Sequence, residues 1–310
     1  MKADIYGKTI KLPDFLIVGA NKGGTTSLYY YLKQHPQIFM PLLKEPNFFL
    51  FGGEPPPPQP FPDKKKMERI WRFDDYVSLF EGAGEGQILG EASTPYLTGN
   101  KKAIPNIKKF VPGWEGLKII MVLRDPAARA FSQYMMYRLW GVEKLEFEDA
   151  IREYKDLRGR ETNVPRYIGP GYYYEQVKAY MDNFSHIKVH LFDDLKADTP
   201  KVVKETFRFL GVDESFVSAT GTRFNPSGKP KSEFIDKLLS TPSVISSKLP
   251  LFKKISLQTR IELTEKLRGL NLQKKERLKE DTRQYLINLY RQDVLKLQEL
   301  IGRDLSGWLK

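Results

Sequence analysis

The stretch DFLIVGANKGGTTSLYYYL, residues 14–32, decides the fold of this 310-residue chain. Its apolar run at residues 15–18 predicts a buried strand, and residues 25–34 are expected to form the helix that follows the glycine turn. A helix entered in this way offers unpaired N–H groups and the positive end of its dipole, and nucleotide-binding proteins usually hold a phosphate there. The stretch therefore predicts an anion-binding loop in an α/β fold.

The side chains of this loop suit an anion, but their order is unusual. Gly23 and Gly24 allow a ligand to approach the backbone closely, and the hydroxyls of Thr25 and Thr26 can donate hydrogen bonds to it. Lys22 adds a positive charge but precedes the glycines, whereas the ATP-binding loop GxxxxGK[ST] has its lysine after them. The dinucleotide fingerprint GxGxxG is absent too. On its own, the loop is equally compatible with an ordinary glycine turn and a solvent-exposed lysine.

The rest of the chain alternates short apolar runs with amphipathic segments, which is typical of βαβ units. Strands are expected at residues 15–18, 88–91, 119–123 and 188–192, and helices at residues 25–34, 127–139, 171–183 and 199–210. From residue 258 onward the pattern is mostly helical, and a packed terminal helix is expected to contain Leu295, Leu297, Leu300 and Ile301. The pattern predicts a central, mainly parallel sheet flanked by helices, with a helical C-terminal part.

Two segments break this pattern. Residues 52–66, GGEPPPPQPFPDKKK, contain too much proline for a helix or a central strand. A stiff surface connection is favoured there over a flap beside a cleft. Residues 223–234, RFNPSGKPKSEF, are expected to form a turn-rich loop with two lysines that leads into a short helix.

Composition limits the classes of function. Hydrophobic residues make up 41% of the chain, enough for a core, and the lack of cysteine excludes disulfides and thiolate metal sites. There is no run of about 18 apolar residues and no signal-peptide pattern at the start, so no membrane span and a cytoplasmic location are expected. The net charge of +12 attracts anions. Its basic residues are scattered and no RNA- or DNA-binding motif occurs, so no nucleic-acid partner is expected.

Several short motifs resemble, in the same order, those of a known enzyme family. They are KGGTTSL (residues 22–28), HPQI (35–38), KEPNFF (44–49), EASTPYL (91–97), LRDPAARAFSQY (123–134), GYYYEQVKAYMDNF (171–184) and NPSGKPKS (225–232). Together they resemble the PAPS-dependent sulfotransferases, in which 3′-phosphoadenosine 5′-phosphosulfate (PAPS) is the sulfuryl donor. The resemblance is closest to the heparan sulfate sulfotransferases and to bacterial sulfotransferases, including polyketide-associated ones. It implies a P-loop-kinase-like fold in one domain, residues 1–310, with a PAPS-binding α/β core at residues 14–232 and a helical part at residues 233–310.

The resemblance also implies how PAPS is bound. Lys22 would contact the bridging oxygen and the leaving phosphate, where an ammonium stabilises the charge that develops as the S–O bond breaks. Arg124 and Ser132 would bind the 3′-phosphate, which a guanidinium can hold in a bidentate fork. An ion pair with Asp125 is the alternative for Arg124. The remaining residues implied for the PAPS site are Gly23, Gly24, Thr25, Thr26 and Ser27 in the first loop, and Ser227, Gly228, Lys229 and Lys231 in the late loop.

Glu45 is the general base that the resemblance implies, because the matching glutamate of heparan sulfate sulfotransferases takes the proton of the attacking group. Without the resemblance, Glu45 reads as a surface glutamate in a proline turn. Cytosolic small-molecule sulfotransferases use a histidine base instead. None of the three histidines, His35, His186 and His190, stands in a suitable motif, so a histidine base is the less favoured interpretation.

One motif departs from the heparan sulfate enzymes, which carry a further lysine after the glutamate of EASTPYL. In this chain, Ala92 and Ser93 occupy the positions after that glutamate. Their presence argues against a heparan-like acceptor and against a second catalytic lysine. Glu91 and Tyr96 are candidates for the acceptor cleft, with core packing as the alternative for Tyr96. The acceptor therefore stays open between a glycan, a lipid-like hydroxyl and a carrier-bound acyl chain, and the oligomeric state stays open too.

The activity expected from the resemblance is transfer of a sulfuryl group from PAPS, as co-substrate, to a hydroxyl or amine by in-line displacement, with no metal. Two other functions compete with it. A P-loop-type kinase or NTPase is disfavoured by the missing GK[ST] order and by the lack of an acidic Mg²⁺ motif. The other competitor is a non-catalytic protein that binds a phosphonucleotide.

Overall fold

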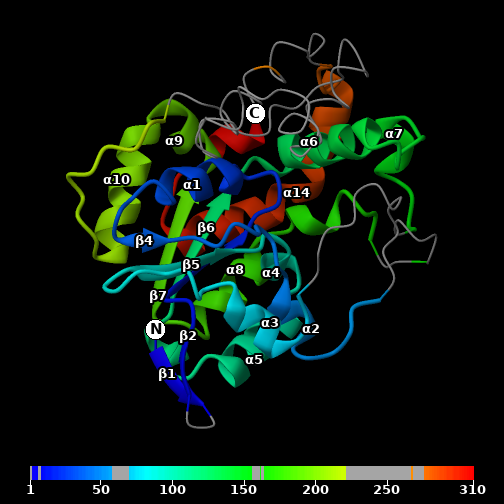
Figure 1. Cartoon of the computed structure of the whole chain (residues 1–310). Helices are drawn as coiled ribbons and strands as arrows, with labels where there is room; N and C mark the ends of the chain where they lie inside the picture. Colours follow the sequence, from blue (N-terminus) through cyan, green and yellow to red (C-terminus); the bar gives the residue numbers. More distant parts are fainter. Residues whose placement is uncertain are drawn as a thin grey trace.

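A parallel sheet of five strands lies at the centre of the protein, in the order β4-β5-β3-β6-β7 (Figure 1). The structure is a computed structural model and describes residues 2–5, 8–57, 70–155, 161, 164–220, 267 and 276–310. The strands of the sheet are β3 (Phe15–Gly19), β4 (Ile38–Phe39), β5 (Ile88–Ala92), β6 (Lys118–Leu123) and β7 (His186–Leu191). The prediction of a mainly parallel central sheet is confirmed.

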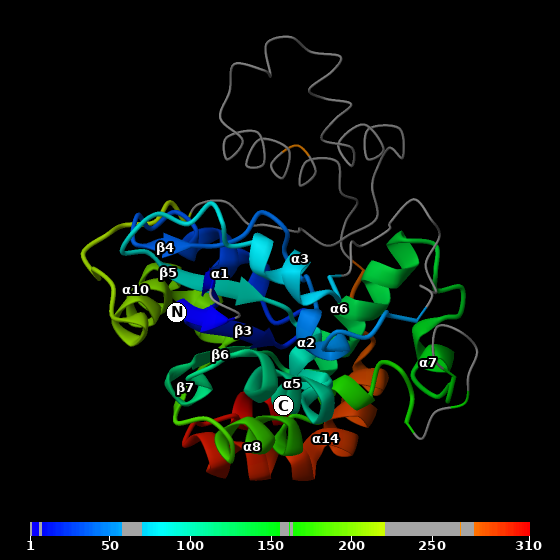
Figure 2. The ribbon, with the colours of Figure 1, turned by 60° about the horizontal axis from the view of Figure 1, so that its bottom comes forward.

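Helices cover both faces of the sheet. Figure 2 shows α1 on one side of the sheet and α5, α8 and α14 on the other. The longer helices are α1 (Thr25–Leu32), α5 (Asn100–Phe110), α6 (Pro126–Leu139), α8 (Tyr174–Met181), α10 (Thr199–Leu210) and α14 (Glu280–Ile301). The shorter ones are α2 (Phe48–Phe51), α3 (Phe73–Ser78), α4 (Pro95–Thr98), α7 (Phe147–Ala150) and α9 (Phe192–Ala197), with 3₁₀ turns η2 (Trp114–Gly116), η3 (Gly169–Gly171) and η5 (Ser306–Leu309). Among the helices of the described residues, none is long and apolar enough to cross a membrane.

Strand β3 is buried over its whole length because helices cover both of its faces. Phe15 and Ile17 pack in a cluster with side chains of α1 and α10. Leu16 and Val18 point the other way and pack in a second cluster with side chains of α4, α5 and α8. This alternation is the two-residue period of a strand, and it explains why the decisive stretch reads as a continuous apolar run.

The C-terminal helix α14 packs into the second of these clusters, through Leu286, Tyr290, Val294 and Leu297. A packed terminal helix was expected, and Leu297 is buried as predicted. The inclusion of Leu295 among the packed residues is wrong, because this side chain is 38% exposed. Helix α14 ends at Ile301, where Gly302 adopts the left-handed conformation that often closes a helix.

The strands and helices predicted before residue 221 are present, with ends that differ by a few residues, whereas the turn-rich loop and short helix expected at residues 223–234 lie outside the described residues. Several elements were not predicted. Strand β4 has only two residues, and β1 (Lys2–Ile5) with β2 (Lys8–Lys11) forms a separate antiparallel hairpin rich in lysine. Helix α5 contains Pro105 in its interior, which counts against a helix in sequence. Residues 58–66 of the proline-rich segment lie outside the described residues, so the choice between a connection and a flap stays open.

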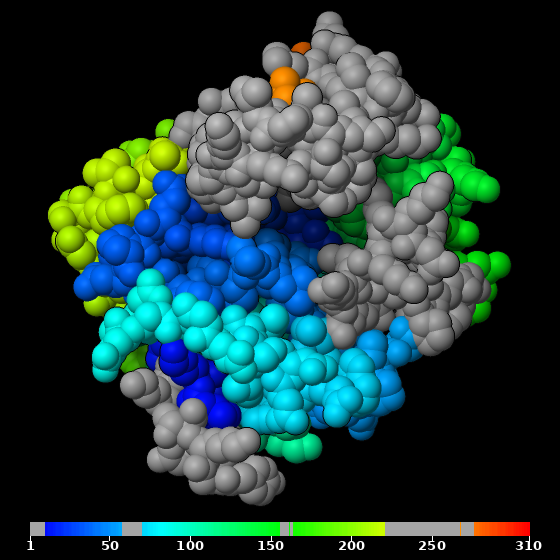
Figure 3. Space-filling view, in the orientation of Figure 1, coloured from blue at the N-terminus to red at the C-terminus, as the bar shows by residue number. Residues whose placement is uncertain are grey.

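The order of the strands indicates at which edge of the sheet a ligand site is expected. From β3 the chain runs to β4 and β5 on one side of the sheet, and then to β6 and β7 on the other side. Ligands of open α/β sheets bind at the carboxyl ends of the strands where the order reverses in this way. In the space-filling view, the blue first quarter of the chain lies between α10 at one side and the green segment containing α6 and α7 at the other (Figure 3).

Candidate active site

The loop from β3 to α1 is held tightly against β6. The N–H of Ala20 donates to the carbonyl of Val122 at 2.9 Å, and the N–H of Gly23 donates to the carbonyl of Ala20 at 2.9 Å. A Cβ on Gly23 would lie 2.1 Å from the Val122 carbonyl oxygen, so only glycine fits there. Gly24 has a φ of 98° and is the N-cap of α1, so the first turn of this helix and its dipole lie at the end of the loop. The loop thus forms the narrow, N–H-rich turn that an anion requires.

Lys22 stands at the top of this turn in the left-handed conformation, with a φ of 67°. Its carbonyl accepts a hydrogen bond from Arg124 Nη1 at 3.2 Å. Its ammonium Nζ lies 3.6 Å from the sulfur of Met136 on α6. The lysine therefore reaches from the end of β3 across to α6, and the half-buried side chain remains at the carboxyl edge of the sheet.

Arg124 follows β6 directly and lies beside the same loop. Its guanidinium stacks over the ring of Phe192 at 4.7 Å, and its backbone carbonyl accepts a hydrogen bond from the Tyr173 hydroxyl at 3.1 Å. Burial lowers the pKa of Arg124, yet an arginine stays charged. The Asp125 carboxylate caps α6 at the N–H of Ala127 and pairs with Arg283 at 2.8 Å. Asp125 therefore has roles of its own, which weakens the interpretation that it is the main partner of Arg124.

Ser132 is buried on α6, one helical turn before Met136. Residues four apart lie on one face of a helix, so Ser132 lies on the face of α6 that reaches Lys22. The structure thus places Lys22, Gly23, Gly24, Thr25, Thr26 and Ser27 in one turn, with Arg124 and Ser132 on the neighbouring strand–helix unit. The late-loop residues Ser227, Gly228, Lys229 and Lys231 lie outside the described residues.

Glu45 lies on the other side of the carboxyl edge, tied to the end of β5. Its N–H donates to the carbonyl of Ala92 at 3.0 Å. Its carboxylate accepts from Lys44 Nζ at 2.7 Å and from the Thr94 hydroxyl at 2.9 Å, and its side chain is 19% exposed. Burial raises the pKa of Glu45, but Lys44, the Thr94 hydroxyl and the charge of Lys22 outweigh it and hold the pKa below its ordinary value. Glu45 is therefore an ionised carboxylate within electrostatic reach of Lys22.

A buried polar network supports the loop that carries Glu45. Both Glu45 and Asn47 have left-handed backbones, and the Asn47 amide donates to the Glu45 carbonyl at 2.7 Å. The N–H of Asn47 donates to the Ser93 hydroxyl at 3.1 Å. Such conformations cost free energy outside glycine, so the hydrogen bonds fix a strained loop. Neither Asn47 nor Ser93 was singled out in the sequence for this role.

Glu91 lies deeper in the same network and is 1% exposed. One of its carboxyl oxygens accepts hydrogen bonds from the hydroxyls of Tyr76 at 3.2 Å and Tyr96 at 3.0 Å, while the other has no partner among the described residues. Burial raises the pKa of Glu91 to about 7. Glu91 and Tyr96 thus support the Glu45 loop from the core, which favours the packing alternative for Tyr96 over a place in the acceptor cleft.

The histidines have other surroundings. The ring of buried His35 is hydrogen-bonded to the carbonyl of Asp213 at 2.8 Å and accepts from the N–H of Gln37 at 3.0 Å. His190 is buried in β7 against the Thr206 hydroxyl at 2.9 Å, and burial lowers its pKa to about 4. His186 begins β7, at the amino end of the strand. His35 and His190 are thus bonded within the core, and a histidine base stays the less favoured interpretation.

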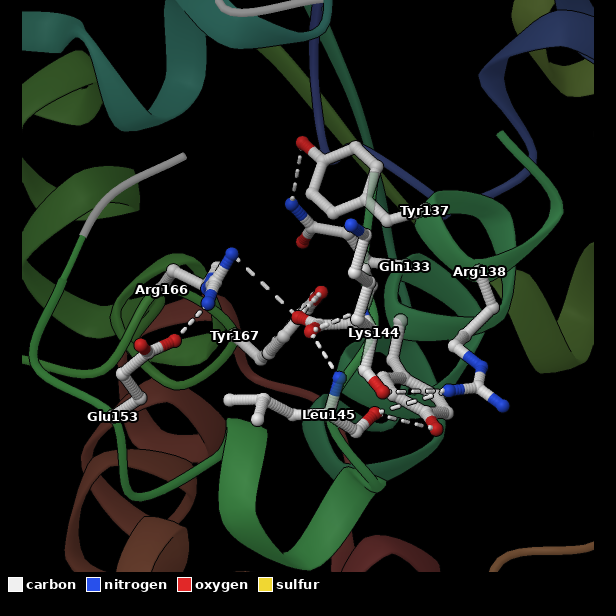
Figure 4. Close-up of polar contacts among 10 residues, drawn as sticks. Gln133, Tyr137, Arg138, Lys144, Leu145, Glu153, Arg166 and Tyr167 are labelled. Carbon is white, nitrogen blue, oxygen red and sulfur yellow. Dashed lines mark hydrogen bonds and ion pairs between the residues drawn. The ribbon is translucent and has the colours of Figure 1, made fainter. Parts of the chain in front are cut away.

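A second polar cluster, which the sequence did not reveal, joins α6 to the segment after it (Figure 4). The Tyr167 hydroxyl donates to the Glu143 carboxylate at 2.7 Å, and Arg166 lies between Glu143 and Glu153. On α6, Gln133 and Tyr137 point toward each other. In the sequence, Gln133 and Tyr137 are four residues apart and therefore lie on one face of α6. This spacing does not show whether the polar side chains are buried in a cluster or exposed to solvent. Within the described part of the chain, no group of acidic and histidine side chains is arranged to hold a metal ion.

Comparisons with known proteins identify the family. A family model described as "Sulfotransferase domain" matches residues 114–293, more than half of the chain. The membrane-associated sulfotransferase kil1 of Dictyostelium discoideum is 31% identical over 176 residues, which cover 51% of this chain and 32% of that protein. The human bifunctional heparan sulfate N-deacetylase/N-sulfotransferase 3 is 28% identical over 216 residues, 65% of this chain and 22% of that protein. The chain thus spans about a third or less of these relatives.

One solved structure is similar over nearly the full length of the chain. The crystal structure of a sulfotransferase from Alicyclobacillus acidocaldarius superposes with a TM-score of 0.72 at 29% identity, covering 97% of this chain and all of that one. The sulfotransferase domain from the curacin biosynthetic pathway shares the fold, with a TM-score of 0.50 at 14% identity over 95% of this chain and 99% of that one. The predicted P-loop-kinase-like sulfotransferase fold is confirmed. Both its sequence and its fold show that the chain belongs to the sulfotransferase family.

Proposed function

We propose that the protein transfers a sulfuryl group from PAPS to a hydroxyl or amine acceptor, with Lys22 and Glu45 as the catalytic residues. One observation carries the proposal. A lysine in an anion-binding turn and an ionised, half-buried glutamate flank the same carboxyl edge of the sheet, and the charge of Lys22 acts on Glu45. The family match begins at residue 114, so it includes Arg124 and Ser132 but not these two residues. Their roles therefore rest on the geometry and on the motifs.

The residues around the turn fit the donor. PAPS supplies an activated sulfuryl group on its 5′-phosphate. The backbone from Gly23 to Ser27 forms the turn into the N-terminus of α1, where a phosphate can bind, and the missing Cβ at Gly23 lets this turn lie directly against the Val122 carbonyl of β6. Arg124, anchored by its stack on Phe192 and by the Lys22 carbonyl, would hold the 3′-phosphate together with Ser132. The late loop, with Ser227, Gly228, Lys229 and Lys231, is proposed to complete this grip.

The chemistry needs one proton acceptor and one cation at the reacting centre. The acceptor's oxygen or nitrogen forms the new bond to sulfur, and its proton passes to the Glu45 carboxylate. The S–O bond to the 5′-phosphate breaks, and its electron pair stays on the departing 3′-phosphoadenosine 5′-phosphate. Lys22 stabilises the negative charge that grows on that phosphate. Lys44 and Thr94 keep Glu45 ionised before the reaction, so that it is ready to accept a proton.

The acceptor is proposed only as a class. A relative is named as a heparan sulfate N-sulfotransferase, which makes a glycan the first class to examine. Ala92 and Ser93 stand where the heparan sulfate enzymes carry a lysine, so a lipid-like hydroxyl and a carrier-bound acyl chain belong in the same comparison.

The test is a screen with sulfur-labelled PAPS against panels of these three acceptor classes, using the wild-type protein and Lys22→Ala. Label should move to an acceptor with the wild type, and Lys22→Ala should slow the transfer at least about a hundredfold. Lys102→Ala, a change of an exposed lysine on α5, is the matched control. Mg²⁺-dependent ATP hydrolysis without any effect of PAPS would support a kinase or NTPase instead. PAPS binding without turnover on any panel would support the non-catalytic alternative.

A further inference from the structure

Three consecutive residues at the end of β5 hold the loop that carries Glu45. The Ala92 carbonyl accepts from the N–H of Glu45 at 3.0 Å, and the Ser93 hydroxyl accepts from the N–H of Asn47 at 3.1 Å. The buried Thr94 hydroxyl donates to the Glu45 carboxylate at 2.9 Å. The first two bonds fix the backbone of the loop, and the third fixes the side chain of the base.

The same end of β5 is joined to the strand that leads to Lys22. Ala92 pairs with Ile17 in the parallel ladder of β5 and β3, and β3 runs into the loop that carries Lys22. Thr94 therefore donates to the carboxylate from the part of the sheet that also carries Lys22. Lys44, the other partner of the carboxylate, belongs to the same loop as the base. The bond from Thr94 thus fixes the carboxylate relative to Lys22, which a bond from Lys44 cannot do.

Both hydrogen bonds of the carboxylate go to one oxygen. Lys44 Nζ donates to Oε1 of Glu45 at 2.7 Å, and the Thr94 hydroxyl donates to the same oxygen at 2.9 Å. Oε2 has no hydrogen-bond partner among the described residues, and it is not one of their fully buried atoms that lack a partner. Because the Glu45 side chain is 19% exposed, Oε2 is open to an incoming group.

The two oxygens of Glu45 differ in what a proton does to these bonds. A proton on Oε2 leaves the lone pairs of Oε1 in place, so Lys44 and Thr94 continue to donate to it. A proton on Oε1 competes with two donors for the same oxygen and turns the Thr94 hydroxyl away. Protonation of Oε2 therefore needs no rearrangement of the hydrogen bonds around the carboxyl group.

We propose that Thr94 is a positioning residue for the base, which binds Oε1 of Glu45 and presents Oε2 to the proton of the acceptor. This inference rests on the proposed function, in which Glu45 takes that proton. The proton passes from the acceptor's oxygen or nitrogen to Oε2 as that atom forms its bond to sulfur. A carboxylate that is already held in this direction loses less freedom in the transition state than one that can rotate.

The first test removes the hydroxyl and keeps the volume of the side chain. Thr94→Val should lower kcat about ten- to fiftyfold at a pH above the acid limb, where Glu45 is ionised in every variant, and Thr94→Ser should restore most of the rate. The dissociation constant of PAPS, measured by calorimetry, should stay within about twofold of the wild-type value in both variants, which shows that the donor site is intact. Thr98→Val, which removes an exposed hydroxyl bonded to the Pro95 carbonyl, is the matched control and should keep the wild-type kcat.

The plateau of the pH profile separates a positioning role from an effect on the pKa. Against the effect of burial, the Thr94 hydroxyl helps to lower the pKa of Glu45, so its removal raises that pKa and moves the acid limb to higher pH. A hydroxyl that acted on the pKa alone would leave the plateau of kcat unchanged or raise it, because a stronger base accepts a proton more readily. A plateau in Thr94→Val at or above the wild-type value would overturn the inference.

The second test asks whether Thr94 acts through Glu45. In the Glu45→Gln background, where the base is absent, adding Thr94→Val should change the residual rate less than about twofold. If Thr94→Val slows the Glu45→Gln variant and the wild type by the same factor, Thr94 acts on another group, and its positioning role is refuted.

The outcomes separate this inference from the proposed function. A wild-type protein that transfers no label from PAPS to any acceptor refutes both, and so does a wild-type rate in Glu45→Gln. An active wild type whose rate falls in Glu45→Gln but not in Thr94→Val leaves the proposed function standing and refutes the inference alone.

Discussion

Glu45 combines two opposing influences on its pKa, and the residues around it decide the balance. Burial would make it a weak acid that holds its proton, whereas the Lys44 ammonium and the Thr94 hydroxyl favour the charged form. The carboxylate is thus ionised, and in the role of base that we propose for it, it would bind a proton more tightly once an anionic donor offsets the charge of Lys22. A base of this kind suits a reaction in which proton transfer accompanies bond formation.

Lys44 should determine the position of the acid limb in the pH profile of the activity. Its ion pair with Glu45 lowers the pKa of the carboxyl, so Lys44→Ala leaves the effect of burial less opposed and raises that pKa. The acid limb of the pH profile of kcat/KM should therefore move to higher pH, while Lys44→Arg should keep the wild-type limb. An acid limb at the same pH in Lys44→Ala and wild type would show that Glu45 is not the group that titrates.

Glu91 should make the protein less stable as the pH rises. Its pKa is about 7 in the folded chain against an ordinary value of 4.5, so the folded state binds the proton more tightly than the unfolded state. The contribution of Glu91 to the free energy of unfolding is fully present below about pH 4.5. It is lost as the pH rises to about 7, which lowers the free energy of unfolding by about 3 kcal/mol.

Urea unfolding at pH 5 and pH 8 measures this contribution. From pH 5 to pH 8 the wild type should lose stability, whereas Glu91→Gln has no carboxyl to ionise in the core. The difference in the free energy of unfolding, Glu91→Gln minus wild type, should therefore rise from pH 5 to pH 8. Glu85→Gln, at an exposed position, should show no such change relative to the wild type. The same pH dependence in Glu91→Gln and wild type would mean that Glu91 does not titrate in this range.

At the scale of elements, α14 connects the C-terminal part to the site through α8. The Asp293 carboxylate on α14 accepts hydrogen bonds from the N–H groups of Tyr173 at 2.7 Å and Tyr174 at 3.2 Å, where α8 begins. The Tyr173 hydroxyl in turn bonds to the carbonyl of Arg124. Asp293 thus acts as an N-cap supplied by another helix, in a place that local sequence patterns cannot reveal.

Removing this cap should destabilise the protein. Asp293→Ala leaves two helix N–H groups without their acceptor and should lower the free energy of unfolding by about 1–2 kcal/mol. Asp293→Asn, which keeps one acceptor oxygen, should lose less, and Gln292→Ala at an exposed neighbouring position should lose almost nothing. Denaturation by urea compares the three variants, and a wild-type stability of Asp293→Ala would show that the α8 N–H groups do not depend on α14.

At the scale of the whole molecule, the features of the fold that depend on local sequence patterns were predictable from the sequence. The apolar run before Lys22 and the strand before Arg124 placed two parts of the site at the carboxyl edge of a parallel sheet, as observed. The partners of these residues were not predictable in the same way. Thr94 lies 49 residues from Glu45, and Met136 lies 114 residues from Lys22, so these contacts depend on the order of the strands. The two-residue strand β4 is too short to give any periodic signal.

In the proposed mechanism, Glu45 as the base and Lys22 as the phosphate-stabilising lysine lie on the two sides of one sulfuryl group. Single-turnover transfer from labelled PAPS tests it most directly when Glu45→Gln is compared with Glu54→Gln, a change at an exposed glutamate. Glu45→Gln should bind PAPS with the wild-type dissociation constant and transfer the label at least about a hundredfold more slowly, while Glu54→Gln keeps the wild-type rate. Transfer by Glu45→Gln at nearly the wild-type rate would contradict the account.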